Sequence, residues 1–128
     1  MILNLTQHDP TPEQIAAGVV AWDNTTQSTI SKLLTFEELP TDLEIADRAY
    51  RLATLAAELG QDCTKPQAMI GGAPFLMSAL ERHLVDQGVQ PVYAFSVRRS
   101  TEQVQSDGTV IKVSPFRHLG FVTPPKGG

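Results

Sequence analysis

A strand, a glycine turn, a helix and a second strand follow one another within residues 67–97, and this succession constrains the fold most strongly. A short apolar run ends at Ile70, two glycines follow, and Pro74 stands at the first position of a helical pattern. The β-branched and aromatic run 92–97 comes next. A unit of about 30 residues is typical of two parallel strands joined by a crossover helix. We therefore predict a parallel βαβ unit.

Similar signals occur in the first half of the chain. Residues 2–6 alternate apolar and polar side chains and predict a first strand. Residues 11–14, Thr-Pro-Glu-Gln, are typical of a capping box at the start of a short helix. The longest helical pattern covers residues 41–59 and ends at Gly60. Residues 23–31 are rich in Thr, Ser and Asn and predict a loop, or a short polar helix at its end.

The last third of the chain changes to a strand pattern. Residues 102–113 turn at Ser-Asp-Gly 106–108, a strong hairpin signal, and residues 119–122 predict another strand. Strands that alternate with helices indicate an α/β fold. We predict a small Rossmann-like three-layer domain over residues 1–122. Its sheet is mainly parallel and carries a C-terminal antiparallel hairpin, and residues 123–128 form a flexible tail.

Composition narrows the class of protein. A chain of 128 residues with 41% apolar side chains can bury a core without a disulfide or a metal staple. Cys63 is the single cysteine, which excludes an internal disulfide and fits a reducing cytoplasm. The opening residues lack the pattern of a signal peptide, and no apolar run reaches the length of a membrane helix. We expect a cytoplasmic protein without a membrane partner.

Charge is unevenly distributed along the chain. Residues 1–64 hold ten acids and three bases, a net charge of −7, whereas residues 65–128 hold four acids and seven bases, a net charge of +3. The overall charge of −4 argues against a protein that binds duplex DNA through a strongly basic surface. A local positive pocket built from the second half is compatible with this balance, and so is segregation that serves solubility alone.

Three segments are expected to meet at one rim, because parallel sheets bind ligands beyond the carboxyl ends of their strands. The glycine turn allows close approach of a ligand to the backbone and leaves helix N–H groups for an anion, although a tight turn packed on the sheet explains the same residues. Arg98 and Arg99 are candidates for phosphate binding, because arginine pairs bidentately with phosphate; the alternative is that they are a solvated pair on the surface. The residues of the three segments are Thr6, Gln7, His8, Gly71, Gly72, Ala73, Arg98 and Arg99.

Further candidates lie near the C-terminus and at the first strand. Lys112, Arg117 and His118 add positive charge that can reach the rim from the hairpin side, and an ordinary strand histidine is the alternative for His118. His8 is the candidate for proton transfer or ligand binding, with a hydrogen-bonded turn histidine as its alternative. No His/Cys cluster has the spacing of a zinc site, so we predict no metal and no cofactor. The acids within residues 37–47 are interpreted as solvated helix charges.

The opening residues 2–8, followed by 11–14, resemble the start of small stand-alone CRISPR-associated proteins of the CARF (Rossmann-like) type, and residues 71–74 and 93–96 are compatible with that architecture. The resemblance implies a homodimer that binds a cyclic oligoadenylate, in some members with slow, metal-free cleavage. The ligand's own 2′-hydroxyl is then the nucleophile, and the protein aligns the bond and stabilises the phosphate. The residues with suitable chemistry are Thr6, His8, Ser96 and Arg98.

Residues 93–98, 110–112 and 116–122 also resemble small proteins of phages and prophages. The first hypothesis is a protein that binds a nucleotide-type anionic signal and, as a metal-independent ring nuclease, cleaves it. Two alternatives stay open beside it. One is an interaction module without small-molecule activity, whose acidic first half contacts a host protein. The other is an enzyme acting on a nucleoside or a nucleotide sugar.

Overall fold

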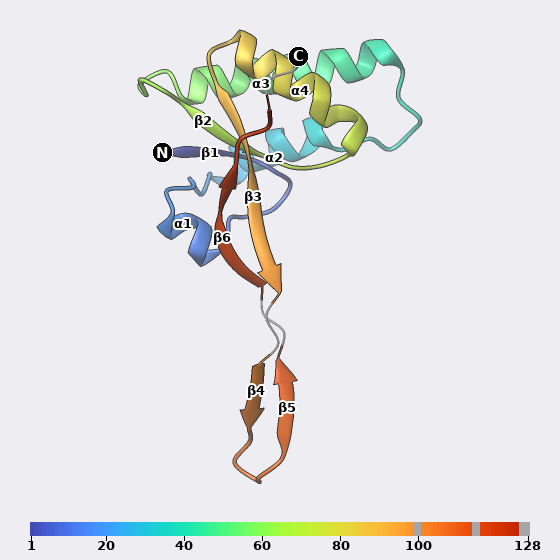
Figure 1. The fold of residues 1–128 in the computed structure, drawn as a ribbon. Coiled ribbons are helices and arrows are strands. Elements are labelled where there is room, and N and C mark those ends of the chain that lie inside the picture. Colours follow the sequence, from blue (N-terminus) through green and yellow to red (C-terminus); the bar gives the residue numbers. More distant parts are fainter. Residues whose placement is uncertain (99–100, 114–115, 126–128) are drawn as a thin grey trace.

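The computed structural model describes residues 1–98, 101–113 and 116–125. Its fold is mixed α/β, and the main sheet has the strand order β1-β2-β3-β6 (Figure 1). β1, β2 and β3 are parallel and β6 is antiparallel to β3, which confirms the mostly parallel sheet and the βαβ unit. The elements are β1 (Ile2–Leu5), α1 (Pro12–Ala16), α2 (Asn24–Leu34), α3 (Asp42–Leu59), β2 (Gln67–Ile70), α4 (Pro74–Asp86), β3 (Gln90–Arg98), β4 (Thr101–Val104), β5 (Val110–Val113) and β6 (Phe116–Val122).

One face of the main sheet carries α2, α3 and α4. Leu3 and Leu5 of β1 share a buried core with side chains of all three helices, among them Leu34, Leu52 and Leu80. The chain steps from β1 to β2 to β3 in one direction across the sheet. Because crossovers between parallel strands are right-handed, two steps in the same direction place both crossover helices on the same face.

The opposite face carries a smaller apolar cluster. Ile2, Val19, Met69 and Val92 are buried there, and Phe121 of β6 packs against them. In place of the helical layer that we predicted for this face, the described residues supply the five-residue α1, which lies beside β6 and away from α3 and α4 (Figure 1). The one-directional strand order also leaves the three parallel strands without a topological switch point.

Side-chain caps fix where the helices begin. The amide of Gln14 donates to Thr11 Oγ1 at 3.2 Å and the Thr11 amide donates to Gln14 Oε1 at 3.0 Å, so the predicted capping box is confirmed. Thr41 caps α3 by accepting from the Glu44 amide at 3.2 Å. The Glu44 carboxylate binds Arg48, so Thr41 and Glu44 do not form the reciprocal capping box that Thr11 and Gln14 form.

The segment that we predicted as a loop forms α2. Asp23 is its N-cap and accepts from the Thr26 amide at 2.7 Å, and these hydrogen bonds lower the pKa of the Asp23 carboxyl. Ile30 and Leu34, one turn apart, are buried in the core and hold the helix on the sheet. Tertiary packing therefore outweighs the weak helix propensity of the Ser- and Thr-rich sequence.

β3 runs well past its neighbour β2. Its first three residues pair with β2, whereas the stretch from Tyr93 to Arg98 pairs with β6 and contains a bulge after Phe95. β4 and β5 form a separate antiparallel pair beyond the end of this ribbon, with the predicted turn at residues 106–108 (Figure 1). The main sheet is thus extended by β6 rather than by the hairpin. We call β3 and β6 beyond Tyr93, together with β4 and β5, the arm.

Two contacts tie the outer elements to the body. The Tyr93 hydroxyl donates to Glu81 Oε2 of α4 at 2.6 Å. The His118 amide of β6 donates to Glu13 Oε2 of α1 at 3.0 Å. Within the described part of the chain, no helix is both long and apolar enough to cross a membrane.

Candidate functional site

The carboxyl ends of β1 and β2 form the rim that the sequence predicts. Leu5 pairs with Ile70 at the end of the parallel ladder, so the residues that follow each strand lie next to each other. A Cβ added to Gly71 would stand 3.6 Å from the Thr6 methyl carbon. The segments 6–8 and 71–73 therefore meet, which accounts for two of the three segments expected there.

The third segment does not reach this rim. Met69 pairs with Val92, so the end of β2 is level with Tyr93, and Arg98 lies five residues further along β3. At about 3.3 Å per residue this is a displacement of roughly 16 Å. The expectation that Arg98 and Gly72 share a rim is wrong, because β3 continues into the arm instead of ending beside β2.

The remaining C-terminal candidates also belong to the arm. Ser96 pairs with His118, and Val97 pairs with Arg117, on the ribbon formed by β3 and β6. Both ring nitrogens of His118 are buried without a hydrogen-bond partner in the described residues, and the ring stands 4.8 Å from that of Phe121. His118 thus packs where α1 meets β6. Arg99 lies outside the described residues, and so does the side chain of Lys112.

A buried asparagine shapes the loop after β1. Asn4 is fully buried, and its Nδ2 donates to the His8 carbonyl at 2.8 Å. Its Oδ1 accepts from the Thr6 amide at 3.1 Å and from the Thr6 hydroxyl at 2.7 Å. The Thr6 hydroxyl is therefore committed to holding the loop, which leaves the exposed His8 as the rim residue suited to proton transfer. The sequence signal for the role of Asn4 in holding the loop was a polar residue between apolar neighbours in the first strand.

Two glutamines connect the rim to α2. The Gln7 Nε2 donates to Thr35 Oγ1 at 2.9 Å, just beyond the end of α2. The Gln27 Nε2 donates to the Thr6 carbonyl at 2.9 Å, and its Oε1 is buried without a partner in the structure as described. A buried acceptor without a donor is costly, so this oxygen offsets part of the stability that the Gln27 contact provides.

The glycine turn is held by packing. Gly72 has φ +152°, a conformation that L side chains rarely adopt, and its Cα faces Met77 and Leu34, which an added Cβ would meet at 3.5 and 3.7 Å. This favours the tight-turn explanation for Gly72. Ala73 makes no side-chain cap at the start of α4, so the first N–H groups of that helix receive no side-chain acceptor from the cap residue.

The described residues contain a pocket of about 460 Å³ between the end of α2 and the start of α3. Arg48 is one of the residues that line it. Its Nη1 donates to the carbonyls of Lys32, Leu33 and Thr35 at 3.0, 3.1 and 2.8 Å, and its Nη2 donates to Glu44 Oε1 at 3.2 Å. The guanidinium therefore satisfies the last carbonyls of α2. The pocket is lined by Ser28, Ser31, Lys32, Thr35, Glu37, Glu38, Glu44 and Arg48.

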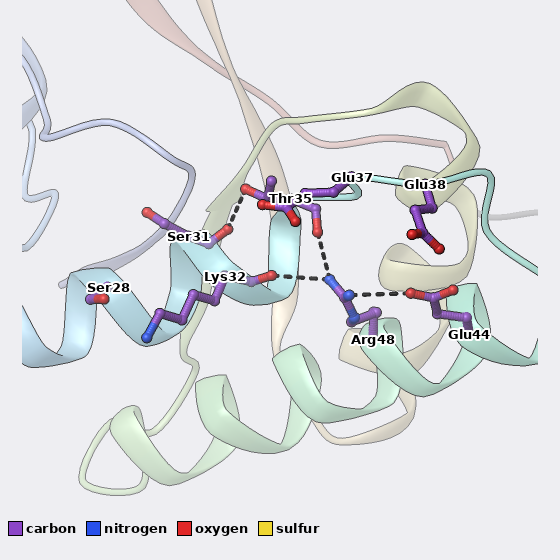
Figure 2. A pocket seen from close by; sticks show the side chains of 8 residues that line it. All are labelled: Ser28, Ser31, Lys32, Thr35, Glu37, Glu38, Glu44 and Arg48. Carbon is purple, nitrogen blue, oxygen red and sulfur yellow. Dashed lines mark hydrogen bonds and ion pairs between the residues drawn. The ribbon is translucent and has the colours of Figure 1, made fainter.

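Charge is separated along this pocket. Figure 2 shows Lys32 reaching toward Ser28 at one end, Glu38 and Glu44 at the other, and Arg48 between them. The sequence indicates solvated helix charges for these acids and does not reveal the pocket, because it predicts mostly a loop where α2 forms. Since Gln7 binds Thr35, the pocket adjoins the rim.

Aromatic rings link the pocket to the start of α4. The Arg48 guanidinium lies 4.8 Å from the centre of the Phe36 ring, and Phe36 contacts Phe75 edge to face at 5.2 Å. Trp22 and Phe36 are partly buried and pack against the core. Among the residues that the structure describes, no group of three or more His, Cys, Asp or Glu side chains is placed to hold a metal ion.

These features define a mixed α/β domain with a mostly parallel sheet and a polar pocket beside the carboxyl ends of its first two strands. A family model described as "Uncharacterized protein MJ1673 family" matches residues 1–122, and the chain belongs to this family. No curated protein and no solved structure matches the chain.

Proposed function

We propose that this chain is a small, cytoplasmic, Rossmann-like domain that binds a phosphate-bearing, nucleotide-type ligand in the pocket between α2 and α3. The observation that carries the proposal is the separation of charge in the pocket, with Lys32 at one end and Glu38 and Glu44 at the other (Figure 2). The pocket also lies beside the carboxyl ends of β1 and β2, where the loops that follow these two parallel strands meet.

The two ends of the pocket suit the two parts of a nucleotide. The Lys32 ammonium group is suited to bind phosphate. In dinucleotide-binding proteins a carboxylate accepts hydrogen bonds from ribose hydroxyls, and Glu38 offers such a carboxylate here. Arg48 is committed to three carbonyls and to Glu44, so Lys32 is the cation of the pocket that we assign to phosphate. A volume of about 460 Å³ fits a small molecule.

Within this ligand class we favour a cyclic oligonucleotide, on the strength of the resemblance of the opening residues to CARF-type proteins. In metal-free cleavage the ligand's own 2′-hydroxyl would attack the adjacent phosphorus and the bond to the 5′-oxygen would break, which leaves a 2′,3′-cyclic phosphate and a 5′-hydroxyl. His8 on the rim is suited to move the proton. Thr6 would act through the loop that it holds with Asn4. Ser96 and Arg98 have no role in this version of the site, because they lie on the arm.

A thermal-shift screen with cyclic oligoadenylates, cyclic dinucleotides and mononucleotides tests the proposal. A ligand at 100 times its dissociation constant stabilises the folded chain by about 2.7 kcal/mol. Lys32→Gln should weaken binding about tenfold or more, because a hydrogen bond to a charged group contributes about 1.5–3 kcal/mol. Lys65→Gln, a change at an exposed lysine outside the pocket, is the matched control and should bind as the wild type does.

Two outcomes would contradict the proposal. One is the absence of a shift with every nucleotide tested, and the other is equal affinity of the wild type and Lys32→Gln. The cleavage step has its own readout, since incubation of the bound ligand followed by chromatography should show product with the wild type and far less with His8→Ala. If the ligand stays intact after incubation with the wild type, the cleavage step is refuted and only the binding function remains.

A second candidate function, a protein-interaction module, is favoured by the apolar side chains on the arm. Val104 and Val110 stand opposite each other on the hairpin, and both are exposed. Soluble proteins expose few clustered apolar residues without a binding role. A chain that responds to none of the nucleotides but loses a partner when Val104 is made polar would support this function over the first.

A further inference from the structure

We propose that the ligand of this site carries at least two phosphate groups, and that the second of them binds in a cationic pocket next to Lys32. The inference rests on the proposed function, because it adds a subsite to the same ligand site. It narrows the ligand class from a nucleotide with any number of phosphates to one with two or more.

A second pocket, of about 350 Å³, lies between α2 and α3. Lys32 and Arg48 line both this pocket and the one described above, so the two pockets adjoin at these side chains. A ligand bound at Lys32 can therefore extend from one pocket into the other. The residues that line the second pocket are Thr29, Lys32, Leu33, Arg48 and Arg51.

The two pockets differ in charge. Of the described residues that line the second pocket, three are bases and none is an acid, whereas two bases and three acids line the first. A lining of this kind favours a group with more than one negative charge, and phosphate is such a group in nucleotides. The second pocket therefore suits phosphate alone, while the first suits phosphate at one end and hydroxyl groups at the other.

Arg51 is the base that only the second pocket contains. It lies one turn after Arg48 on α3, so both side chains lie on the same side of the helix. The Arg51 Nη1 lies 3.7 Å from Asp47 Oδ2, and these side chains are 60% and 61% exposed. A solvated ion pair contributes little stability, so the guanidinium can turn to a phosphate at little cost. Arg48, in contrast, is held by three carbonyls and a carboxylate.

The order of groups along the two pockets matches a nucleotide with a second phosphate. Figure 2 shows Glu38 and Glu44 at one end of the first pocket and Lys32 at the other. The ribose then lies at the acidic end, one phosphate binds Lys32, and the next binds Arg51. A nucleoside diphosphate has two adjoining phosphates, and a cyclic dinucleotide has two that lie one nucleotide apart. Both share the chemistry that we propose, and the experiment separates them.

Isothermal titration calorimetry of the full chain with AMP, ADP and cyclic di-AMP tests the second subsite. Low ionic strength is needed because salt screens exposed charges. We expect ADP or cyclic di-AMP to bind the wild type about tenfold more tightly than AMP. In Arg51→Gln this advantage should disappear, while AMP binds as it does to the wild type. Arg82→Gln, a change at an exposed arginine that lines neither pocket, is the matched control and should keep the advantage.

Two further measurements separate the subsite from damage to the fold and from the proposed function. Asp47→Asn removes the carboxylate that competes for Arg51, so it should strengthen the binding of the ligand with two phosphates. Pyrophosphate has neither ribose nor base, so it tests the second subsite without the nucleoside. It should bind the wild type and bind Arg51→Gln about tenfold more weakly.

The outcomes separate the two proposals. If AMP binds through Lys32 but ADP and cyclic di-AMP bind no more tightly, or if Arg51→Gln keeps their advantage, the second subsite is refuted and the proposed function stands. If pyrophosphate binding depends on Arg51 but no nucleotide binds, the nucleotide function is refuted and the phosphate subsite stands. If none of these compounds binds, both are refuted. A preference for ADP supports adjoining phosphates, and a preference for cyclic di-AMP supports separated ones.

Discussion

Replacement of Asn4 by leucine should destabilise the chain and release the loop after β1. Asn4 is fully buried and makes three hydrogen bonds to Thr6 and His8, at 2.8, 3.1 and 2.7 Å. Leucine has a similar size and suits a buried strand, so the change in packing is small. The loss of polar partners therefore dominates the effect.

The magnitude follows from the three bonds. A neutral hydrogen bond contributes about 0.5–1.5 kcal/mol, so loss of all three lowers the free energy of unfolding by about 2–4 kcal/mol. The Thr6 hydroxyl keeps a second acceptor, the His8 carbonyl at 3.1 Å, which places the loss below the upper limit. With a denaturant slope of about 2 kcal/mol per molar urea, the unfolding midpoint should fall by about 1–2 M.

Urea unfolding followed by circular dichroism measures this loss, and the fluorescence of Trp22, the single tryptophan, reports on the same place. The Trp22 indole donates to the Asn4 carbonyl at 2.9 Å. Thr6→Val removes one hydroxyl and leaves the Asn4 amide in place, so it should cost less than half as much as Asn4→Leu. An Asn4→Leu chain within about 0.5 kcal/mol of the wild type would refute the argument that this network shapes the rim.

Three further changes test other parts of the account. Burial, followed by the hydrogen bond to the α4 carboxylate, raises the pKa of Tyr93 well above its usual value of about 10. Because the folded state retains this proton, the free energy of unfolding should fall as pH rises above about 10, and it should fall less steeply in Tyr93→Phe. Urea midpoints over a pH series measure both. Gly72→Ala should cost about 1–3 kcal/mol in thermal unfolding because of its φ of +152°, whereas Gly71→Ala, whose new Cβ makes an ordinary contact, should cost less. Arg48→Lys should lower the urea midpoint by the equivalent of about 1–3 kcal/mol, because lysine cannot serve three carbonyls and a carboxylate together, and an unchanged midpoint would contradict its role at the end of α2.

Local signals predicted the central part of the fold. Neighbouring residues carry the signals for three successive elements: the strand that ends at Ile70, the glycine turn and the helix that begins at Pro74. These signals agree with one another. α2 was missed because its Ser and Thr residues have weak helix propensity. The spacing of Ile30 and Leu34 behind a good N-cap at Asp23 was the signal that could have revealed it.

Long-range pairing explains why the site was only partly predicted. Periodicity identifies β3 as a strand but does not say where its neighbour β2 ends, and the pairing with β6 carries Arg98 away from the rim. The pocket depends on the place where α2 ends, since Arg48 binds the carbonyls exposed there. His8 and Gly71 lie where strand order predicts, because parallel neighbours end at the same edge.

The most direct test of the proposed ligand site is a titration of the ¹⁵N-labelled full chain followed by amide chemical shifts. A cyclic oligoadenylate, a cyclic dinucleotide and AMP would be added in separate experiments. The account predicts that the responding amides cluster around Lys32, the segment 35–44 and the rim at 6–8, and that the response weakens in Lys32→Gln. Shifts confined to the arm around Arg98 and Arg117, or no shift with any of the three nucleotides, would contradict it.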